Sequence, residues 1–468
     1  MINFKGKKVL FAGWEKGTVA CAKYLASQGA QLKLSEIRPK DHLADAVAKL
    51  QSVDPKMEME FGQHSSAFLE NVDFIVRATD VSPQTPALLE ASVRGVVVTT
   101  EIELLAQQTN IPFVAICGGY GKSTVASILT KLLTESDMKV FLSSDLGKPL
   151  GELLLQNAQF NFVVLELSPQ QIEGLDKFKP LMVIFTNADG NYLQERFSSL
   201  EDYQHNYLKV LKNTDVETTI IYNFRDPVLR KLMIAKTGGY SGSNLRLFRR
   251  KDPNLDNTVK FPGGYRGAYL VHQRELVLAN GENKEVYNLR YTKLFGIYNK
   301  ENLMAAVIAA RAANCSQKAI QNVIDAYPGT AHRLEFVKKK GGVTFINDSR
   351  STGPDSMAKA LEAFTTEPII LIAGGKDGQA NFTPLVELVK KRVKILILIG
   401  EAKESVNRMI GDYAETFLVG TFEEAALIAY QKSREGDIIL LSPGCESYDM
   451  FVSYEERGNY FKKYVEEI

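Results

Sequence analysis

The sequence predicts an α/β protein with three domains, and three observations support this expectation. The chain has 468 residues, which corresponds to about three domains of ordinary size. Short apolar runs alternate with helical patterns almost throughout, and this order is typical of parallel sheets covered by helices. Hydrophobic residues make up 45% of the chain, so each domain can bury a core. The predicted domains are 1–107, 108–330 and 331–468.

The first domain is expected to be a small Rossmann-like unit. Its predicted strands are Val9–Ala12, Gln31–Ser35, Phe74–Val76 and Val96–Thr99. Open parallel sheets of this kind bind ligands beyond the carboxyl ends of their strands.

The middle domain opens on the most informative motif of the chain. Residues 117–124 read Cys-Gly-Gly-Tyr-Gly-Lys-Ser-Thr, between an apolar run and a helical pattern. Glycines let backbone N–H groups point at phosphate oxygens, Lys122 can neutralise the β- and γ-phosphates, and the Ser123 hydroxyl can hold Mg²⁺. The flanking strand and helix favour this P-loop interpretation over a chance Gly-Lys-Ser on a solvated turn. The residues expected to bind ATP here are Gly118, Gly119, Gly121, Lys122, Ser123 and Thr124.

The remainder of the middle domain is predicted to continue a parallel sheet and then to form a small β region. The predicted strands are Val140–Leu142, Phe162–Leu165, Leu181–Phe185 and Thr219–Tyr222, followed by hairpins over 245–291 and a helix over 302–313. Glu166 follows one of these strands, where a carboxylate beside a phosphate loop is a candidate Mg²⁺ ligand. The alternative interpretation of Glu166 is a surface charge at the end of a strand.

The third domain is expected to be a second Rossmann-like unit with candidate ligand-binding loops. Its predicted strands include Ile369–Ile372, Lys394–Ile399 and Ile438–Leu441. Arg333 lies at the domain junction, where its planar guanidinium suits a γ-phosphate, although such a residue often forms an interface salt bridge instead. Asp348 follows a strand and is a candidate ligand for a ribose hydroxyl.

The composition excludes several classes of partner. The formal charge is +1 and no basic stripe with interleaved aromatic residues is present, so we expect no nucleic-acid partner. The apolar runs have the length of strands, far below the roughly 20 residues of a membrane span, so we expect no membrane insertion. Five histidines and four scattered cysteines show no metal-ligand spacing and fit a reducing compartment. We expect a cytoplasmic monomer.

Taken together, these clusters resemble the Mur ligase family across nearly the whole chain, and within it the members that add D-glutamate. The matching segments are Gly296 with 299–302 (Asn-Lys-Glu-Asn), 333–335 (Arg-Leu-Glu), 347–350 (Asn-Asp-Ser-Arg) with Thr352, 441–443 (Leu-Ser-Pro), 447–451 (Ser-Tyr-Asp-Met-Phe) and 455–458 (Glu-Glu-Arg-Gly). The resemblance implies that ATP phosphorylates the carboxylate of a UDP-linked muramoyl peptide. The amine of an amino acid then attacks the acyl phosphate.

The resemblance also implies roles for individual residues. Lys122, Glu166 and Arg333 would be catalytic, Ser123 and Glu166 would bind Mg²⁺, and Asn302 and Asp348 would contact the adenine and the ribose of ATP. The UDP-linked substrate and the amino acid would be bound by Thr18, Glu36, Arg38, Asp145, Arg350, Thr352, Lys376, Ser447 and Tyr454.

Several positions depart from the family pattern. Gly118 stands where Thr is usual, and Asp145 stands where Asn is usual. Asn191 or Tyr192 occupies the position of a metal-binding His. Tyr207 replaces a Lys that is carbamylated and Gly378 replaces another Lys, although Lys209 lies near the first position and Lys376 near the second. A phenol, whose pKa is about 10, cannot replace a carbamate or an imidazole as a metal ligand at neutral pH. Asp145 and Asp189 are candidate substitutes. The number of metal ions and the amino acid added stay open.

Three alternative functions remain. The first is a related ATP-dependent ligase, such as a folylpolyglutamate synthase-like enzyme, although such members lack a separate N-terminal domain. The second is a non-catalytic binding or regulatory protein that kept the fold, which the residues at 192, 207 and 378 motivate. The third is a generic P-loop kinase, which would leave the C-terminal clusters unexplained.

Overall fold

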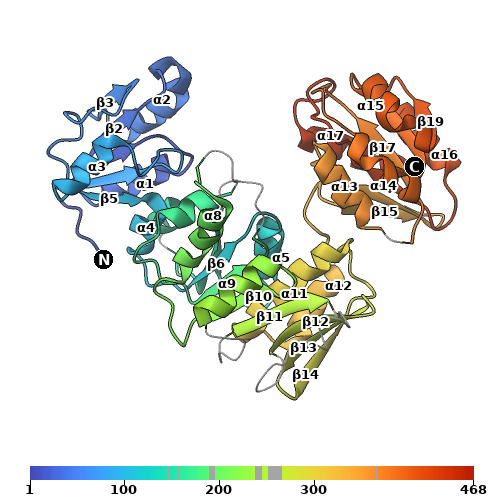
Figure 1. The fold of residues 1–468 in the computed structure, drawn as a ribbon, viewed down its shortest axis with the longest axis horizontal. Coiled ribbons are helices and arrows are strands. Elements are labelled where there is room, and N and C mark those ends of the chain that lie inside the picture. The colour runs from blue at the N-terminus through green and yellow to red at the C-terminus, as the bar shows by residue number, and fades with distance from the viewer. Residues whose placement is uncertain (145–146, 157, 189–195, 238–244, 251–265, 365) are drawn as a thin grey trace. The chain divides into compact units, whose positions relative to one another are not determined.

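The computed structural model describes residues 1–144, 147–156, 158–188, 196–237, 245–250, 266–364 and 366–468. Within these residues the strands form three sheets, most of whose strand pairs are parallel, and helices follow most strands (Figure 1). The predicted α/β class is confirmed. The chain forms two compact units, one made of Met1–Tyr287 with Asn302–Ile320 and the other of Asn288–Glu301 with Gln321–Ile468.

The first sheet of the first unit is parallel and carries helices on both faces. Its elements are β1 (Lys8–Ala12), α1 (Thr18–Ser27), β2 (Gln31–Glu36), η1 (Lys40–Leu43), α2 (Ala44–Val53), β3 (Glu58–Phe61), β4 (Phe74–Arg77), α3 (Pro86–Val93), β5 (Val97–Thr100) and α4 (Glu101–Ala106). The strand order is β3-β2-β1-β4-β5. The order reverses between β1 and β4, and ligands of open α/β sheets bind at such a switch point. The sequence analysis missed β3, an edge strand of 4 residues that alternates Glu with Met and Phe.

The second sheet of the first unit contains the phosphate loop. Its elements are β6 (Phe113–Cys117), α5 (Lys122–Thr134), β7 (Val140–Ser143), α6 (Gly151–Leu155), β8 (Phe162–Glu166), α7 (Pro169–Glu173), β9 (Met182–Phe185), α8 (Leu200–Asn206), η2 (Tyr207–Leu211), β10 (Thr219–Asn223), α9 (Pro227–Thr237), β11 (Leu245–Arg250), β12 (Arg266–Val271), β13 (Glu275–Asn280), β14 (Asn283–Asn288), α11 (Ile297–Ala312) and α12 (Gln317–Ala326). The strand order is β14-β13-β12-β11-β10-β9-β6-β8-β7. The predicted small β region therefore continues the same sheet. The helix expected from residue 302 already begins at Ile297, so Asn302 lies within α11.

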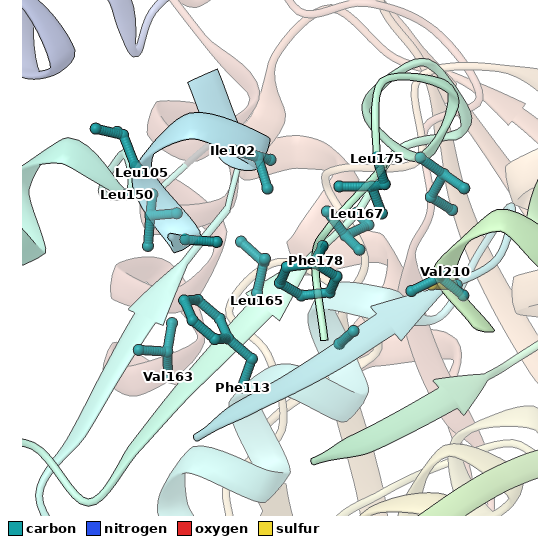
Figure 2. Packing of buried hydrophobic residues seen from close by; sticks show 14 of the residues in the cluster. Ile102, Leu105, Phe113, Leu150, Val163, Leu165, Leu167, Leu175, Phe178 and Val210 are labelled. Carbon is teal, nitrogen blue, oxygen red and sulfur yellow. The ribbon is translucent and has the colours of Figure 1, made fainter. Parts of the chain in front are cut away.

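A continuous hydrophobic core joins the two sheets of the first unit. Ile102 and Leu105 of α4 contribute to the same buried cluster as Phe113 of β6 and Leu165 of β8 (Figure 2). The ring of Phe113 packs edge-to-face on Phe178 with 5.3 Å between the ring centroids. Burial of each such side chain stabilises the fold by about 1.5–3 kcal/mol. The loops at the carboxyl ends of both sheets are thereby held by one packed core.

The sheet of the second unit is doubly wound, as predicted. Its elements are β15 (Glu335–Lys340), β16 (Val343–Asn347), α13 (Pro354–Glu362), β17 (Ile369–Gly374), η3 (Thr383–Leu385), α14 (Val386–Arg392), β18 (Val393–Ile399), α15 (Lys403–Ile410), η4 (Gly411–Tyr413), β19 (Glu415–Leu418), α16 (Phe422–Lys432), β20 (Ile438–Leu441) and α17 (Tyr454–Glu467). Leu371 packs with α13, α14 and α15, whereas its neighbour Ile370 packs with α16 and α17 on the other face. The order β15-β16-β20-β17-β18-β19 brings the loops after β16, β20 and β17 next to one another.

Among the described helices, none combines the length and the apolar composition that a membrane crossing requires.

Candidate functional site

The phosphate loop between β6 and α5 has a backbone that requires glycine at two positions. Gly118 has φ +134° and Gly121 has φ +86°, values that side-chain-bearing residues rarely adopt. A Cβ at Gly118 would lie 2.2 Å from Oγ1 of Thr186, and a Cβ at Gly121 would lie 2.5 Å from Oδ1 of Asn302. The Thr that the family pattern has at 118 would not fit this loop. Asn302 lies directly beside the phosphate loop.

Two residues that the sequence analysis did not select, Thr186 and Asn187, hold the loop in place. Oδ1 of Asn187 accepts hydrogen bonds from the backbone N–H groups of Gly119 (2.9 Å) and Tyr120 (3.3 Å). The Thr186 hydroxyl donates to the Tyr120 carbonyl over 2.7 Å. An acceptor oxygen thus already meets the N–H groups that would bind a phosphate oxygen. Their position directly after β9, the strand beside β6, was the signal that could have identified them.

Lys122, Ser123 and Glu166 lie together at the start of α5. Nζ of Lys122 donates to the Gly118 carbonyl over 2.6 Å. The Ser123 hydroxyl donates to Oε2 of Glu166 over 2.8 Å, and Thr124 beside it is buried. A hydroxyl and a carboxylate at this spacing fit one Mg²⁺, which prefers oxygen ligands and binds through one or two carboxylates with substrate phosphates.

A cleft of about 210 Å³ adjoins this group, and both sheets of the first unit contribute to its walls. The first sheet contributes Glu15, Thr79 and Glu101, and the second contributes Ser143, Glu166 and Gln171. Glu166 therefore both accepts the hydrogen bond of Ser123 and lines the cleft. A ligand in the cleft would meet a nucleotide phosphate at this carboxylate.

The structure brings together the three residues predicted to bind the UDP-linked substrate. Thr18 begins α1, and its hydroxyl accepts the backbone N–H of Glu15 (3.0 Å). Glu36 ends β2, and Arg38 donates to both of its carboxylate oxygens over 3.0 and 2.8 Å. Burial opposes the charge of Glu36, but the hydrogen bonds from Arg38 outweigh it and hold the pKa of this carboxyl below its usual value. Glu36 and Arg38 adjoin the loop after β1, because Arg38 also donates to the Trp14 carbonyl.

In the second unit, Asp348 lies buried where two strands end. Its Oδ2 accepts from the Ser442 hydroxyl (2.9 Å) and its Oδ1 from the Leu334 backbone N–H (3.1 Å). Burial raises the pKa of Asp348 to about 7, against the opposing effect of these hydrogen bonds. Arg333 also belongs to this unit, between His332 and Leu334, whose φ angles are +61° and +44°. Left-handed residues on both sides of Arg333 indicate a backbone held by its surroundings.

The residues predicted to bind the amino acid line the loops of the same sheet. The guanidinium of Arg350 lies 5.5 Å from the ring centroid of Tyr454. The Ser447 hydroxyl is buried without a hydrogen-bond partner within the described part of the chain. Lys376 instead forms an exposed ion pair with Glu401 over 2.8 Å. Thr352 is half-buried, just before α13.

Arg457, at the start of α17, holds these loops together and was not predicted as a site residue. Its guanidinium donates to the carbonyls of Ser349 (2.9 Å), Cys445 (3.0 Å) and Glu446 (3.2 Å) and to the Ser349 hydroxyl (3.0 Å). Its exposed fraction is 1%, and burial lowers its pKa to about 10. Arg457 lies in the segment 455–458 that carries the family resemblance, but a charged residue in a polar helix does not by itself indicate burial.

The position of the family's carbamylated lysine does not fit a second metal ion in this chain. The Tyr207 hydroxyl is hydrogen-bonded to that of Tyr203 over 2.9 Å, and both side chains are fully buried. Lys209 donates instead to the Glu173 carbonyl over 3.2 Å, on an exposed face. A buried phenol stays protonated at neutral pH and is a poor metal ligand. The other candidates, Asp145, Asp189, Asn191 and Tyr192, lie outside the described residues.

Comparison with known proteins identifies two family models along the chain. Residues 116–310 match the Mur ligase middle domain, and residues 332–445 match the Mur ligase, glutamate ligase domain. A relative from Bdellovibrio bacteriovorus named UDP-N-acetylmuramoylalanine–D-glutamate ligase is 39% identical over 467 residues, which covers 99% of this chain and 98% of the relative. A relative of the same name from Geotalea daltonii is 31% identical over 465 residues, or 99% and 98% of the two chains.

Solved structures share the fold at low sequence identity. A pseudomurein peptide ligase type C from Methanothermus fervidus aligns with a TM-score of 0.55 at 17% identity, over 99% of this chain and 100% of that one. A UDP-N-acetylmuramate-alanine ligase from Thermotoga maritima aligns with a TM-score of 0.53 at 17% identity, over 98% and 100%.

Proposed function

This chain belongs to the Mur ligase family, and on that premise we propose that it joins D-glutamate to UDP-N-acetylmuramoyl-L-alanine with cleavage of ATP to ADP and phosphate. The carboxylate of the UDP-linked substrate takes the γ-phosphoryl group of ATP to form an acyl phosphate. The amine of D-glutamate then attacks the carbonyl carbon, phosphate leaves, and an amide bond remains. Relatives that carry the D-glutamate ligase name over nearly the whole chain support this substrate over a folylpolyglutamate-type activity or a generic kinase.

The observation that carries the proposal is the position of Glu166. This carboxylate pairs with Ser123 at the phosphate loop and also lines the cleft shared by the two sheets. The γ-phosphate of ATP and the carboxylate of the UDP-linked substrate can therefore meet there. Catalysis would depend on positioning and on charge neutralisation. Lys122 would neutralise the phosphates, and Arg333 would contribute a second positive charge.

Ser123 and Glu166 would hold Mg²⁺, which supplies charge neutralisation to the phosphates when bound. Asn302 and Asp348 would contact the adenine and the ribose. Residues 1–107 would bind the UDP-linked substrate through Thr18, Glu36 and Arg38. Residues 108–330 would bind ATP, and residues 331–468 would bind the amino acid. We place the reaction in the cytoplasm, where both nucleotide substrates occur, and expect the enzyme to act as a monomer.

The test is phosphate release from ATP, Mg²⁺ and UDP-N-acetylmuramoyl-L-alanine with a panel of amino acids. We expect release with D-glutamate and little with L-glutamate, D-aspartate or L-lysine. Preference for another amino acid would replace the D-glutamate assignment within the same family. ATP binding by calorimetry without phosphate release for any amino acid would favour the non-catalytic alternative.

A further inference from the structure

A largely buried carboxylate, Glu173, joins two arginines in the first unit. Glu173 ends α7, and its Oε2 accepts from Nη2 of Arg196 over 2.5 Å and from Nη2 of Arg77 over 3.4 Å. The side chains of Glu173, Arg196 and Arg77 are only 15%, 16% and 4% exposed. Burial lowers the pKa of Arg77 and the neighbouring charge of Arg196 adds to this effect, whereas the charge of Glu173 opposes it. The negative charge of Glu173 is therefore what allows two cations to lie side by side here.

Both arginines hold the loop that follows β4 in the first sheet. Arg77 donates to the Val81 carbonyl over 2.5 Å, and Arg196 donates to the carbonyls of Thr79 and Val81. Thr79 in turn donates its backbone N–H and its hydroxyl to Oε2 of Glu15 over 3.0 and 2.8 Å. Thr79 and Glu15 both line the cleft. Glu173 is thus connected to one wall of the cleft by the ion pairs that it forms with the two arginines.

The wall that the second sheet contributes is connected to Glu173 through α7 itself. Ser168 caps this helix: its hydroxyl accepts the Gln171 backbone N–H, and the Gln171 side chain accepts the Ser168 backbone N–H over 2.8 Å. Ser168 and Gln171 line the cleft together with Glu166, which precedes the cap by two residues. A helix with both N-terminal bonds of a capping box has a fixed start. Glu173 therefore links the wall that carries Glu166 to the wall that carries Thr79.

We infer that Glu173 is a positioning residue that sets the loop 78–81 against Glu166 and thereby aligns the UDP-linked substrate with the phosphate loop. The inference rests on the proposed function of the cleft. Loss of the carboxylate charge would leave two buried arginines in mutual repulsion and release the carbonyls of the loop. This loss should weaken binding of the UDP-linked substrate and leave ATP binding unchanged, because the phosphate loop is held separately by Thr186 and Asn187.

Glu103 provides a matched control, since it is also a buried carboxylate between the two sheets of this unit. It lies on α4 and accepts the backbone N–H groups of Asp176, Lys177 and Phe178 over 2.9, 2.8 and 3.1 Å. Its exposed fraction is 3%, and it does not line the cleft. Glu173→Gln and Glu103→Gln should both lower the melting temperature. Only Glu173→Gln should act on substrate binding.

The experiment measures KM for each substrate in the parent, Glu173→Gln, Glu173→Asp and Glu103→Gln. We expect Glu173→Gln to raise KM for the UDP-linked substrate about tenfold, as misplacement of a binding loop does, with KM for ATP unchanged. Glu173→Asp should recover part of this loss. Arg196→Gln should raise the same KM, and the double variant should be no worse than Glu173→Gln alone, because the two residues form one network.

Hydrogen–deuterium exchange of residues 78–85 gives a readout that does not depend on activity. Exchange should become faster in Glu173→Gln and stay unchanged in Glu103→Gln. The inference fails if the two variants raise KM equally, if KM for ATP rises as much as that for the UDP-linked substrate, or if exchange over 78–85 is unaltered. A parent chain that does not turn over the UDP-linked substrate would instead reject the proposed function. Exchange would then still decide whether Glu173 orders the loop.

Discussion

The phosphate loop of the first unit and the loops of the second unit that we propose bind the amino acid (the amino-acid loops) both follow parallel strands, but they are held in different ways. The phosphate loop is one contiguous stretch, residues 117–123, shaped by glycines and fixed by the neighbouring Thr186 and Asn187. The amino-acid loops come from three separate stretches, 348–352, 374–378 and 442–449. Arg457 lies between the first and the third, and the Lys376 backbone N–H donates to Glu446 in the third. A local motif specifies the first site, whereas a single buried side chain assembles the second.

The buried arginines of the two units also differ in the groups that accept their hydrogen bonds. In the first unit the buried arginines meet a carboxylate, Glu173, at 2.5 and 3.4 Å. In the second unit the guanidinium of Arg457 directs its hydrogen bonds to carbonyl and hydroxyl oxygens. A buried charge is costly unless its hydrogen bonds are satisfied, so the second arrangement depends on all of its acceptors at once. Substitutions should therefore affect chemistry alone at the phosphate loop, and both folding and binding around Arg457.

The largest effect is expected for Lys122→Ala. Removal of a charge that neutralises the phosphates should lower kcat about 10²-fold or more, comparable to loss of one preorganised stabilising group. The fold should be retained, because Nζ of Lys122 donates to the carbonyls of Gly118 and Gly119 in its own loop, at 2.6 and 3.4 Å. Steady-state kinetics and a melting curve check both parts. Near-normal turnover would contradict the role of this loop in ATP cleavage.

Arg457→Lys should affect both stability and the amino-acid site. Arg457 donates to four acceptor oxygens on Ser349, Cys445 and Glu446, whereas an ammonium group has three donors and no planar fork, so at least one of the four should lose its partner. Each buried acceptor without a partner costs about 1–3 kcal/mol. We expect a lower denaturant midpoint for the second unit and a higher KM for D-glutamate, with KM for ATP less affected. A stable variant with parental kinetics would show that the loops hold without this guanidinium.

Arg350→Ala should raise KM for D-glutamate more than Lys376→Ala. Both are basic residues among those predicted to bind the amino acid, and Gly378 stands where the family has a lysine. Lys376 is engaged with Glu401 at 2.8 Å on the surface, whereas Arg350 is stacked on Tyr454 and can bind a carboxylate bidentately. We expect about tenfold for Arg350→Ala, with kcat largely intact, as for a loss of uniform binding. The opposite order in a D-glutamate titration would assign the carboxylate to Lys376.

The sequence predicted the phosphate loop because its residues are neighbours in the chain and glycine positions can be recognised directly. Glu166 was selected as a candidate because it ends a buried strand, and the structure places it against Ser123 of this loop. Arg457 and Glu173 could not, because burial of a charge depends on segments that are distant in sequence. Arg457 contacts Ser349 from 108 residues away, and Arg196 reaches Thr79 from 117 residues away. Strands β3 and β19 were missed for a different reason: each is an edge strand of only 4 residues, too short for its pattern to stand out.

Asp348→Asn should change how stability depends on pH. The carboxyl has a pKa of about 7 in the folded chain, above its ordinary value of 3.8, so the folded state binds this proton more tightly. The stability of the parent should therefore fall as pH rises from about 4 to about 7, and level off above that range. The asparagine variant lacks this decrease. Denaturant unfolding should show that the free energy of unfolding of the variant, relative to that of the parent, is higher at pH 8 than at pH 5. An equal difference in this free energy at both pH values would contradict the burial of an ionisable group here.

The smallest effect on activity is expected for Tyr207→Phe. The Tyr207 hydroxyl bonds to that of Tyr203 inside a cluster with Phe185 and Phe197, so its loss should leave kcat and the Mg²⁺ requirement within about twofold of the parent. Stability should fall by about 1–3 kcal/mol, because the Tyr203 hydroxyl loses a buried partner. Tyr203→Phe serves as the matched control and should behave alike.

Depletion of dissolved carbon dioxide should not change the turnover of the parent, since residue 207 offers no amine to carbamylate. A loss of turnover above about tenfold for Tyr207→Phe alone, with Tyr203→Phe unaffected, would place this phenol at the reacting phosphates. Tyr207 would then take part in catalysis, and the interpretation of its side chain as part of a buried aromatic cluster would be wrong.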